Sequence, residues 1–146
     1  MRGGATAHSL THFWNPLQLR LQGNAAAERG RFAAAEALYT QALDVGAPRG
    51  DHLVLANRSS VRLQQGDTAG ALADALAAQA DGPGDWTRGL VREAEARAAA
   101  GDAAGARAAL DRAAEVDAFI LRNPDVMALS EETTFVALDD EGYDSD

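Results

Sequence analysis

The sequence repeats one turn motif three times: Glu28-Arg29-Gly30-Arg31-Phe32, Gln64-Gln65-Gly66-Asp67-Thr68 and Ala99-Ala100-Gly101-Asp102-Ala103. The central glycines are 36 and 35 residues apart, and small or apolar residues recur at fixed distances from each of them. Alanine occurs five and twelve residues after each glycine. A small residue occurs seven residues before each glycine, and leucine eleven residues before it. These positions are Ala35, Ala71, Ala106, Ala42, Ala78, Ala113, Gly23, Ser59, Ala94, Leu19, Leu55 and Leu90. Self-similarity at this period indicates a repeat architecture.

Each repeat reads as two helices joined at its glycine. Glycine closes a helix well because it adopts a left-handed backbone without a steric cost. The small residues would let two antiparallel helices approach closely, and the leucine would anchor each first helix. Pro16 after Asn15 is typical of a helix start, and Pro48 and Pro83 are expected to end the second helices of the first two repeats.

The composition favours helices and disfavours strands. Alanine accounts for 34 residues, and aromatic residues for only 5%. Alanine has the highest helix propensity, whereas strands prefer β-branched and aromatic residues. We therefore expect an all-α fold, built as one domain.

Charge and cysteine content exclude several classes of function. Seven of the 22 acidic residues lie in residues 131–146, which contain no base. This C-terminal segment therefore carries most of the net charge of −9. A nucleic-acid-binding domain normally carries a net positive charge, and we expect no nucleic-acid partner. The absence of cysteine excludes disulfides and thiolate chemistry. No apolar run approaches the roughly 20 residues of a membrane span.

At this point the sequence resembles the tetratricopeptide repeat (TPR) family over residues 16–118. The resemblance implies three helix-turn-helix repeats in a right-handed superhelix. Tyr39 occupies the family's large position in the second helix of repeat one, where repeats two and three have Ala75 and Leu110. The family's first-helix aromatic is replaced by Ala26, Arg62 and Arg97. An alanine-rich bundle without superhelical stacking is the alternative.

The chain outside the repeats divides into three parts. Asn123-Pro124 predicts a further helix that would cap repeat three, with Val126, Met127, Leu129 and Phe135 facing it. We therefore expect a TPR domain with capping helix over residues 15–138. Residues 1–14 are expected to be a flexible segment, with a short targeting signal as the alternative. Residues 139–146 are expected to be a disordered acidic tail.

Polar residues on the three first helices are expected to converge on one groove. Arg20 and Asn24 are four residues apart, as are Arg88 and Arg92, so each pair shares a helix face. Asn57 lies on the middle first helix. Arginine binds carboxylates through two parallel hydrogen bonds, and asparagine both donates and accepts. Such a set suits the C-terminal carboxylate of a peptide together with an acidic side chain.

The same residues resemble the two-carboxylate clamp subclass of TPR domains, found in co-chaperones of the heat-shock-seventy and heat-shock-ninety chaperones. Arg20 corresponds to the first basic residue, Asn24 and Asn57 to the asparagines of Gly-Asn and Asn-Arg pairs, and Arg88 and Arg92 to the third-repeat basic pair. Arg20 and Arg88 stand where the family usually has lysine, so the preference among chaperone tails stays open. Further lining is expected from Ala27, Ser60, Leu63 and Gln64.

The resemblance implies a non-catalytic adaptor that binds chaperone tails ending in Glu-Glu-Val-Asp. A TPR scaffold that holds an internal peptide segment is the alternative function, and the five residues would then be ordinary solvated surface. We expect no enzyme activity, cofactor or metal, because no catalytic motif occurs and the pair His8 and His12 lacks a third ligand. We expect a cytoplasmic monomer. The acidic tail ending in Asp146 resembles the implied ligand and is either a competitor for the groove or a solubilising segment.

Overall fold

The computed structural model describes residues 15–47, 50–84 and 86–142, with side chains as far as residue 134. These residues form seven α-helices and one 3-10 helix and contain no strand, which confirms the all-α fold class. In the described part of the chain, no helix has the length and apolar character needed to cross a membrane. The elements are α2 (Pro16–Glu28), α3 (Phe32–Val45), α4 (Asp51–Gln64), α5 (Thr68–Asp81), α6 (Thr87–Ala99), α7 (Ala103–Val116), η1 (Ala118–Arg122) and α8 (Pro124–Gly142).

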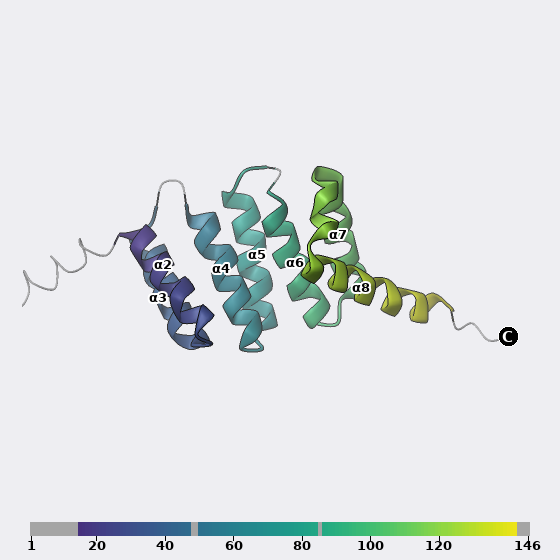
Figure 1. Cartoon of the computed structure of the whole chain (residues 1–146), viewed down its shortest axis with the longest axis horizontal. Helices are drawn as coiled ribbons and strands as arrows, with labels where there is room; N and C mark the ends of the chain where they lie inside the picture. Colours follow the sequence, from purple (N-terminus) through teal and green to yellow (C-terminus); the bar gives the residue numbers. More distant parts are fainter. Residues whose placement is uncertain (1–14, 48–49, 85, 143–146) are drawn as a thin grey trace, which may run out of the picture.

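The first six helices form three antiparallel hairpins stacked side by side, α2 with α3, α4 with α5, and α6 with α7 (Figure 1). Each hairpin also packs on the next through its second helix, α3 against α4 and α5 against α6. The helix α8 follows the last hairpin and packs against α7 and α6. This arrangement confirms three helix-turn-helix repeats with a C-terminal helix.

The turn inside each hairpin is closed by the expected glycine. Gly30, Gly66 and Gly101 have φ angles of 75°, 83° and 86°, in the left-handed region that favours glycine. The residue after two of these glycines caps the next helix, because Asp67 and Asp102 each accept a hydrogen bond from a backbone N–H three residues ahead. The repeated motif therefore ends one helix and starts the other.

The small residues lie where the helices of a hairpin approach most closely. All six of the repeating alanines are fully buried. A methyl group added at Gly23 would lie 2.7 Å from Cδ1 of Tyr39, so only glycine fits between α2 and that ring. Ser59 and Ala94 occupy the same position in the later repeats and are also buried. The core is therefore built largely from buried small residues, in keeping with the scarcity of large apolar ones.

The prediction that a leucine anchors each first helix is wrong for one of the three helices. Leu19 and Leu90 are buried, but Leu55 is only half-buried and the preceding residue, Val54, is 2% exposed. Adjacent residues on a helix point about 100° apart. The α4 helix therefore presents Val54 to the core rather than Leu55, and Val54 packs in the same cluster as Leu19 and Tyr39.

Two arginines form ion pairs at positions where the resemblance to TPR repeats implies an aromatic residue. Arg62 on α4 pairs with Asp74 of its own hairpin at 3.1 Å and with Glu36 of the preceding hairpin at 3.2 Å. Arg97 on α6 pairs with the buried carboxylate of Glu93 at 2.8 Å. The charged ends of both arginines are therefore satisfied by carboxylates.

The C-terminal helix caps the last hairpin, although not with all of the expected residues. Asn123 caps α8 by accepting a hydrogen bond from the N–H of Asp125 at 2.9 Å. Val126 and Leu129 pack on the cluster of α6 and α7, as expected. Met127 does not, since it is 46% exposed and one residue around the helix from Val126.

Several predictions fall outside the described residues or at their edge. The segment 1–14 with its two histidines, Pro48, and the side chain of Phe135 lie outside them. The helix α8 continues to Gly142, past residue 139 where the sequence predicts the acidic tail to begin. Residues 143–146 also lie outside the described part.

Candidate functional site

A polar groove with a volume of about 350 Å³ runs across the first helices of the three hairpins. All five residues of the predicted clamp line it. The complete lining is Arg20, Asn24, Ala27, Glu28, Tyr39, Asn57, Ser60, Val61, Arg88 and Arg92.

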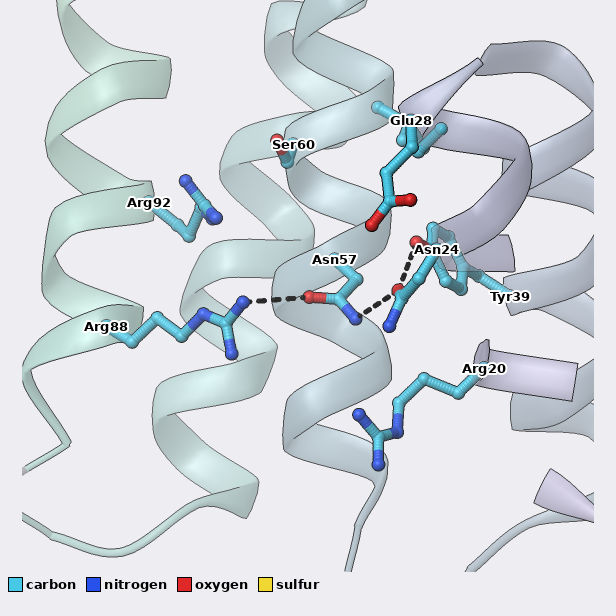
Figure 2. A pocket seen from close by; sticks show the side chains of 10 residues that line it. Arg20, Asn24, Glu28, Tyr39, Asn57, Ser60, Arg88 and Arg92 are labelled. Carbon is cyan, nitrogen blue, oxygen red and sulfur yellow. Dashed lines mark hydrogen bonds between the residues drawn. The ribbon is translucent and has the colours of Figure 1, made fainter. Parts of the chain in front are cut away.

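Helix geometry brings these side chains together from three separate elements (Figure 2). The α2 helix contributes Arg20 and Asn24 from successive turns, and α6 contributes Arg88 and Arg92 in the same way. Asn57 stands on α4 between them. Successive hairpins repeat one packing arrangement, so residues at equivalent repeat positions come to face the same space.

A continuous chain of hydrogen bonds crosses the groove from α6 to α3. Arg88 donates from Nη2 to Oδ1 of Asn57 at 3.3 Å, and Asn57 donates from Nδ2 to Oδ1 of Asn24 at 2.9 Å. The hydroxyl of Tyr39 donates to the same Asn24 oxygen at 2.6 Å (Figure 2). The two asparagines are therefore held by protein groups before any ligand arrives.

This chain determines which way each amide faces. Since Oδ1 of Asn24 accepts two hydrogen bonds, rotating that amide would place its NH₂ group against two donors. The Nδ2 atom of Asn24 is thereby directed away from Tyr39, and it has no acceptor among the described residues. Asn24 therefore presents a donor to the groove, in an orientation that suits a carboxylate oxygen.

The groove concentrates positive charge. Desolvation within the groove lowers the pKa of the Arg88 guanidinium, and the nearby charges of Arg92 and Arg20 lower it further. Burial raises the pKa of the Tyr39 hydroxyl, against the opposite influence of the same three arginines. Tyr39 therefore remains a hydrogen-bond donor at neutral pH. Clustered like charges of this kind are unfavourable in the empty protein and are relieved by an anion.

The three arginines differ in their partners. Arg20 forms no ion pair with any described residue, and Arg88 donates only to the neutral amide of Asn57. Arg92 is paired with Glu95 on its own helix at 2.9 Å. Its Nε atom is buried and has no hydrogen-bond partner among the described residues.

Two of the four residues predicted as further lining lie in the groove wall. Ala27 and Ser60 line the groove, but Leu63 and Gln64 do not. Leu63 is half-buried and Gln64 is exposed at the last turn of α4, beyond the level of Ser60. Among the residues of the last turn of α4, Val61 lines the groove and Leu63 and Gln64 do not.

Sequence reasoning missed three lining residues, namely Glu28, Tyr39 and Val61. Glu28 lies four residues after Asn24, and Val61 four after Asn57, so the helical spacing of the predicted residues would have found both. Tyr39 lies on a second helix rather than a first, and its hydroxyl reaches the groove past Gly23. No sequence pattern signals that contact.

No protein-family model matches the chain, and no curated protein sequence matches it. Solved structures of similar fold include several TPR domains. The first TPR of Spaghetti (RPAP3), bound to the HSP90 peptide SRMEEVD, has a TM-score of 0.74 at 21% identity, over 84% of this chain and 95% of that one. The Sgt2 TPR domain from Aspergillus fumigatus has a TM-score of 0.76 at 24% identity, over 90% and 85%. The TPR2B domain of yeast Sti1, in complex with Hsp70, has a TM-score of 0.71 at 21% identity, over 82% of this chain and 95% of that one. The chain therefore has the fold of TPR domains.

Proposed function

We propose that this chain is a non-catalytic adaptor whose groove binds the free C-terminus of heat-shock chaperone tails that end in Glu-Glu-Val-Asp. The observation that carries the proposal is the convergence of Arg20, Arg88 and Arg92 with two oriented asparagines on one groove. A chain end presents two acceptor oxygens and no following residue, which matches a set of convergent donors.

Each donor has a distinct role in the proposed complex. Asn24 donates from the amide nitrogen that Tyr39 and Asn57 leave facing the groove. Arg20 and Arg88 supply guanidinium groups that form no ion pair with a described carboxylate, and a ligand carboxylate can accept from such a group through both oxygens. Arg92 adds a third positive group for the aspartate side chain of the last ligand residue.

Two of the similar structures support the class of ligand. The RPAP3 domain holds a peptide that ends in Glu-Glu-Val-Asp, and the Sti1 domain is a complex with Hsp70. Both structures are under 25% identical to this chain. The proposed ligand class is therefore argued primarily from the residues that line the groove. The basic positions here are filled only by arginine, a planar fork rather than the point charge of lysine.

The test is calorimetric titration with a free-acid peptide ending in Glu-Glu-Val-Asp, compared between the wild type and Arg88→Ala. We expect a dissociation constant of about 1–40 μM for the wild type. Arg88→Ala should weaken binding about tenfold, because it removes one charged donor from the ligand. Arg31→Ala is the matched control, since Arg31 is exposed at the start of α3 and does not line the groove.

The rival function, a scaffold that holds an internal peptide segment, makes a different prediction. A peptide extended by two residues beyond the aspartate should bind as well as the original if the scaffold reading is right. Loss of binding on extension supports the proposal. A folded protein with no measurable affinity for the free-acid peptide would refute it.

A further inference from the structure

The acidic residue Glu95 lies one turn after Arg92 on α6 and outside the groove lining. We propose that Glu95 is a built-in competitor for Arg92, which weakens carboxylate binding because it occupies Nη1 of the third arginine and places a negative charge beside it. This inference deepens the proposed function and rests on it. Glu95 is thus a specificity-determining residue that does not itself contact the ligand.

The pairing of these two residues is direct. Nη1 of Arg92 donates to both carboxylate oxygens of Glu95, at 2.9 Å and 3.2 Å. The two side chains are 21% and 27% exposed, so both are partly removed from water. A ligand carboxylate that approaches Arg92 meets the negative charge of Glu95, and it must replace these hydrogen bonds in order to use Nη1.

The pairing leaves Arg92 incompletely satisfied. Only one of its three guanidinium nitrogens donates to Glu95, and the Nε atom is buried without a described partner. A buried donor without an acceptor is costly. Arg92 therefore gains when it moves to an arrangement in which a second carboxylate satisfies it, which keeps the pair exchangeable.

The three arginines consequently respond to different ligands. Neither Arg20 nor Arg88 forms an ion pair with a described carboxylate, although Glu28 lines the same groove, so an anionic chain end can use both without breaking an ion pair. Arg92 contributes only when the ligand offers a second carboxylate close to the first. An aspartate-terminated peptide meets that condition, whereas a peptide ending in asparagine supplies one carboxylate at its end.

The experiment compares peptide affinity in the wild type, Glu95→Gln, Arg92→Ala and the double variant Arg92→Ala/Glu95→Gln. Glutamine keeps the size of the side chain and removes its charge. We expect Glu95→Gln to bind the peptide ending in Glu-Glu-Val-Asp about fivefold more tightly, the effect of one partly exposed ion pair. In the Arg92→Ala background the same change should have less than half of that effect.

Two controls separate this effect from net charge. Glu115→Gln removes the same charge from an exposed position on α7 outside the groove and should leave the affinity unchanged. A peptide ending in Glu-Glu-Val-Asn should gain less from Glu95→Gln than the aspartate peptide. Equal gains for both peptides, or an equal gain with and without Arg92, would overturn the inference.

The outcomes distinguish this inference from the proposed function. If the wild type binds the peptide and Glu95→Gln binds it equally well, Glu95 is not a competitor and the proposed function stands. If neither protein binds the peptide, the proposed function fails. The competitor role of Glu95 is then tested by titrating both proteins with sulfate and following the NMR signal of the Arg92 Nε–H. A response at lower sulfate concentration in Glu95→Gln would support the competitor, and an identical response would overturn it.

Discussion

Replacing Asp74 with alanine should destabilise the protein more than any exposed ion-pair change. The carboxylate of Asp74 is 4% exposed and accepts from Arg58 at 2.9 Å and 2.8 Å through both of its oxygens. It also accepts from Arg62 at 3.1 Å. Three charge-assisted hydrogen bonds therefore depend on one buried side chain.

The magnitude follows from what the substitution leaves behind. Removing one partner of a fully buried ion pair costs about 3–5 kcal/mol. Arg58 and Arg62 are 15% and 21% exposed, so water can solvate them in part after the change. We therefore expect a loss of about 2–3 kcal/mol in the free energy of unfolding. For a chain of this length that loss lowers Tm by about 6–9 °C.

The assay is urea and thermal unfolding followed by far-ultraviolet circular dichroism. Asp111→Ala is the matched control, because Asp111 pairs with Arg107 at side-chain exposures of 56% and 40% and should cost less than about 0.5 kcal/mol. Asp74→Asn gives an intermediate case if the alanine variant does not fold. An Asp74→Ala protein no less stable than Asp111→Ala would refute the reasoning, since it would mean that the buried network contributes nothing.

Three further predictions concern the groove and the first helix. Tyr39→Phe should weaken peptide binding about fivefold in calorimetry, since Asn24 loses one of the two donors that orient it; unchanged affinity would show that Asn57 alone is sufficient. Peptide affinity should fall at least tenfold between about 0.05 M and 0.5 M salt, because the contacts are charged and the groove is open; a salt-independent dissociation constant would contradict an electrostatic site. Asn15→Ala should cost about 1 kcal/mol of stability in urea unfolding, because the hydrogen bonds that Asn15 and Gln18 exchange at the start of α2 are lost; an unchanged midpoint would show that this end of the helix is frayed.

The fold was predictable because its signals are local. A turn that needs a left-handed residue selects glycine, and a close helix contact selects alanine or glycine, whatever the rest of the chain does. Gly30 and Ala35 therefore predicted a turn and a close helix contact from the sequence alone. The groove was predictable for a related reason, since a fixed repeat register places Asn57 between Arg20 and Arg88.

The remaining details depend on small rotations and on partners from distant parts of the chain. Whether Val54 or Leu55 faces the core is a difference of one helix position, which periodicity does not resolve when both are apolar. The contact of Tyr39 with Asn24 joins residues 15 positions apart on two helices. The pair of Arg92 with Glu95 was within reach of sequence reasoning, because residues three apart on a helix are neighbours.

The central claim is that the groove recognises a free chain end, and one comparison tests it most directly. The wild-type protein is titrated with a peptide ending in Glu-Glu-Val-Asp and with the same peptide amidated at its C-terminus. Amidation removes one negative charge and one acceptor oxygen while it keeps every side chain. We predict micromolar binding of the free acid and at least about tenfold weaker binding of the amide. Equal affinity for the two peptides would contradict the account.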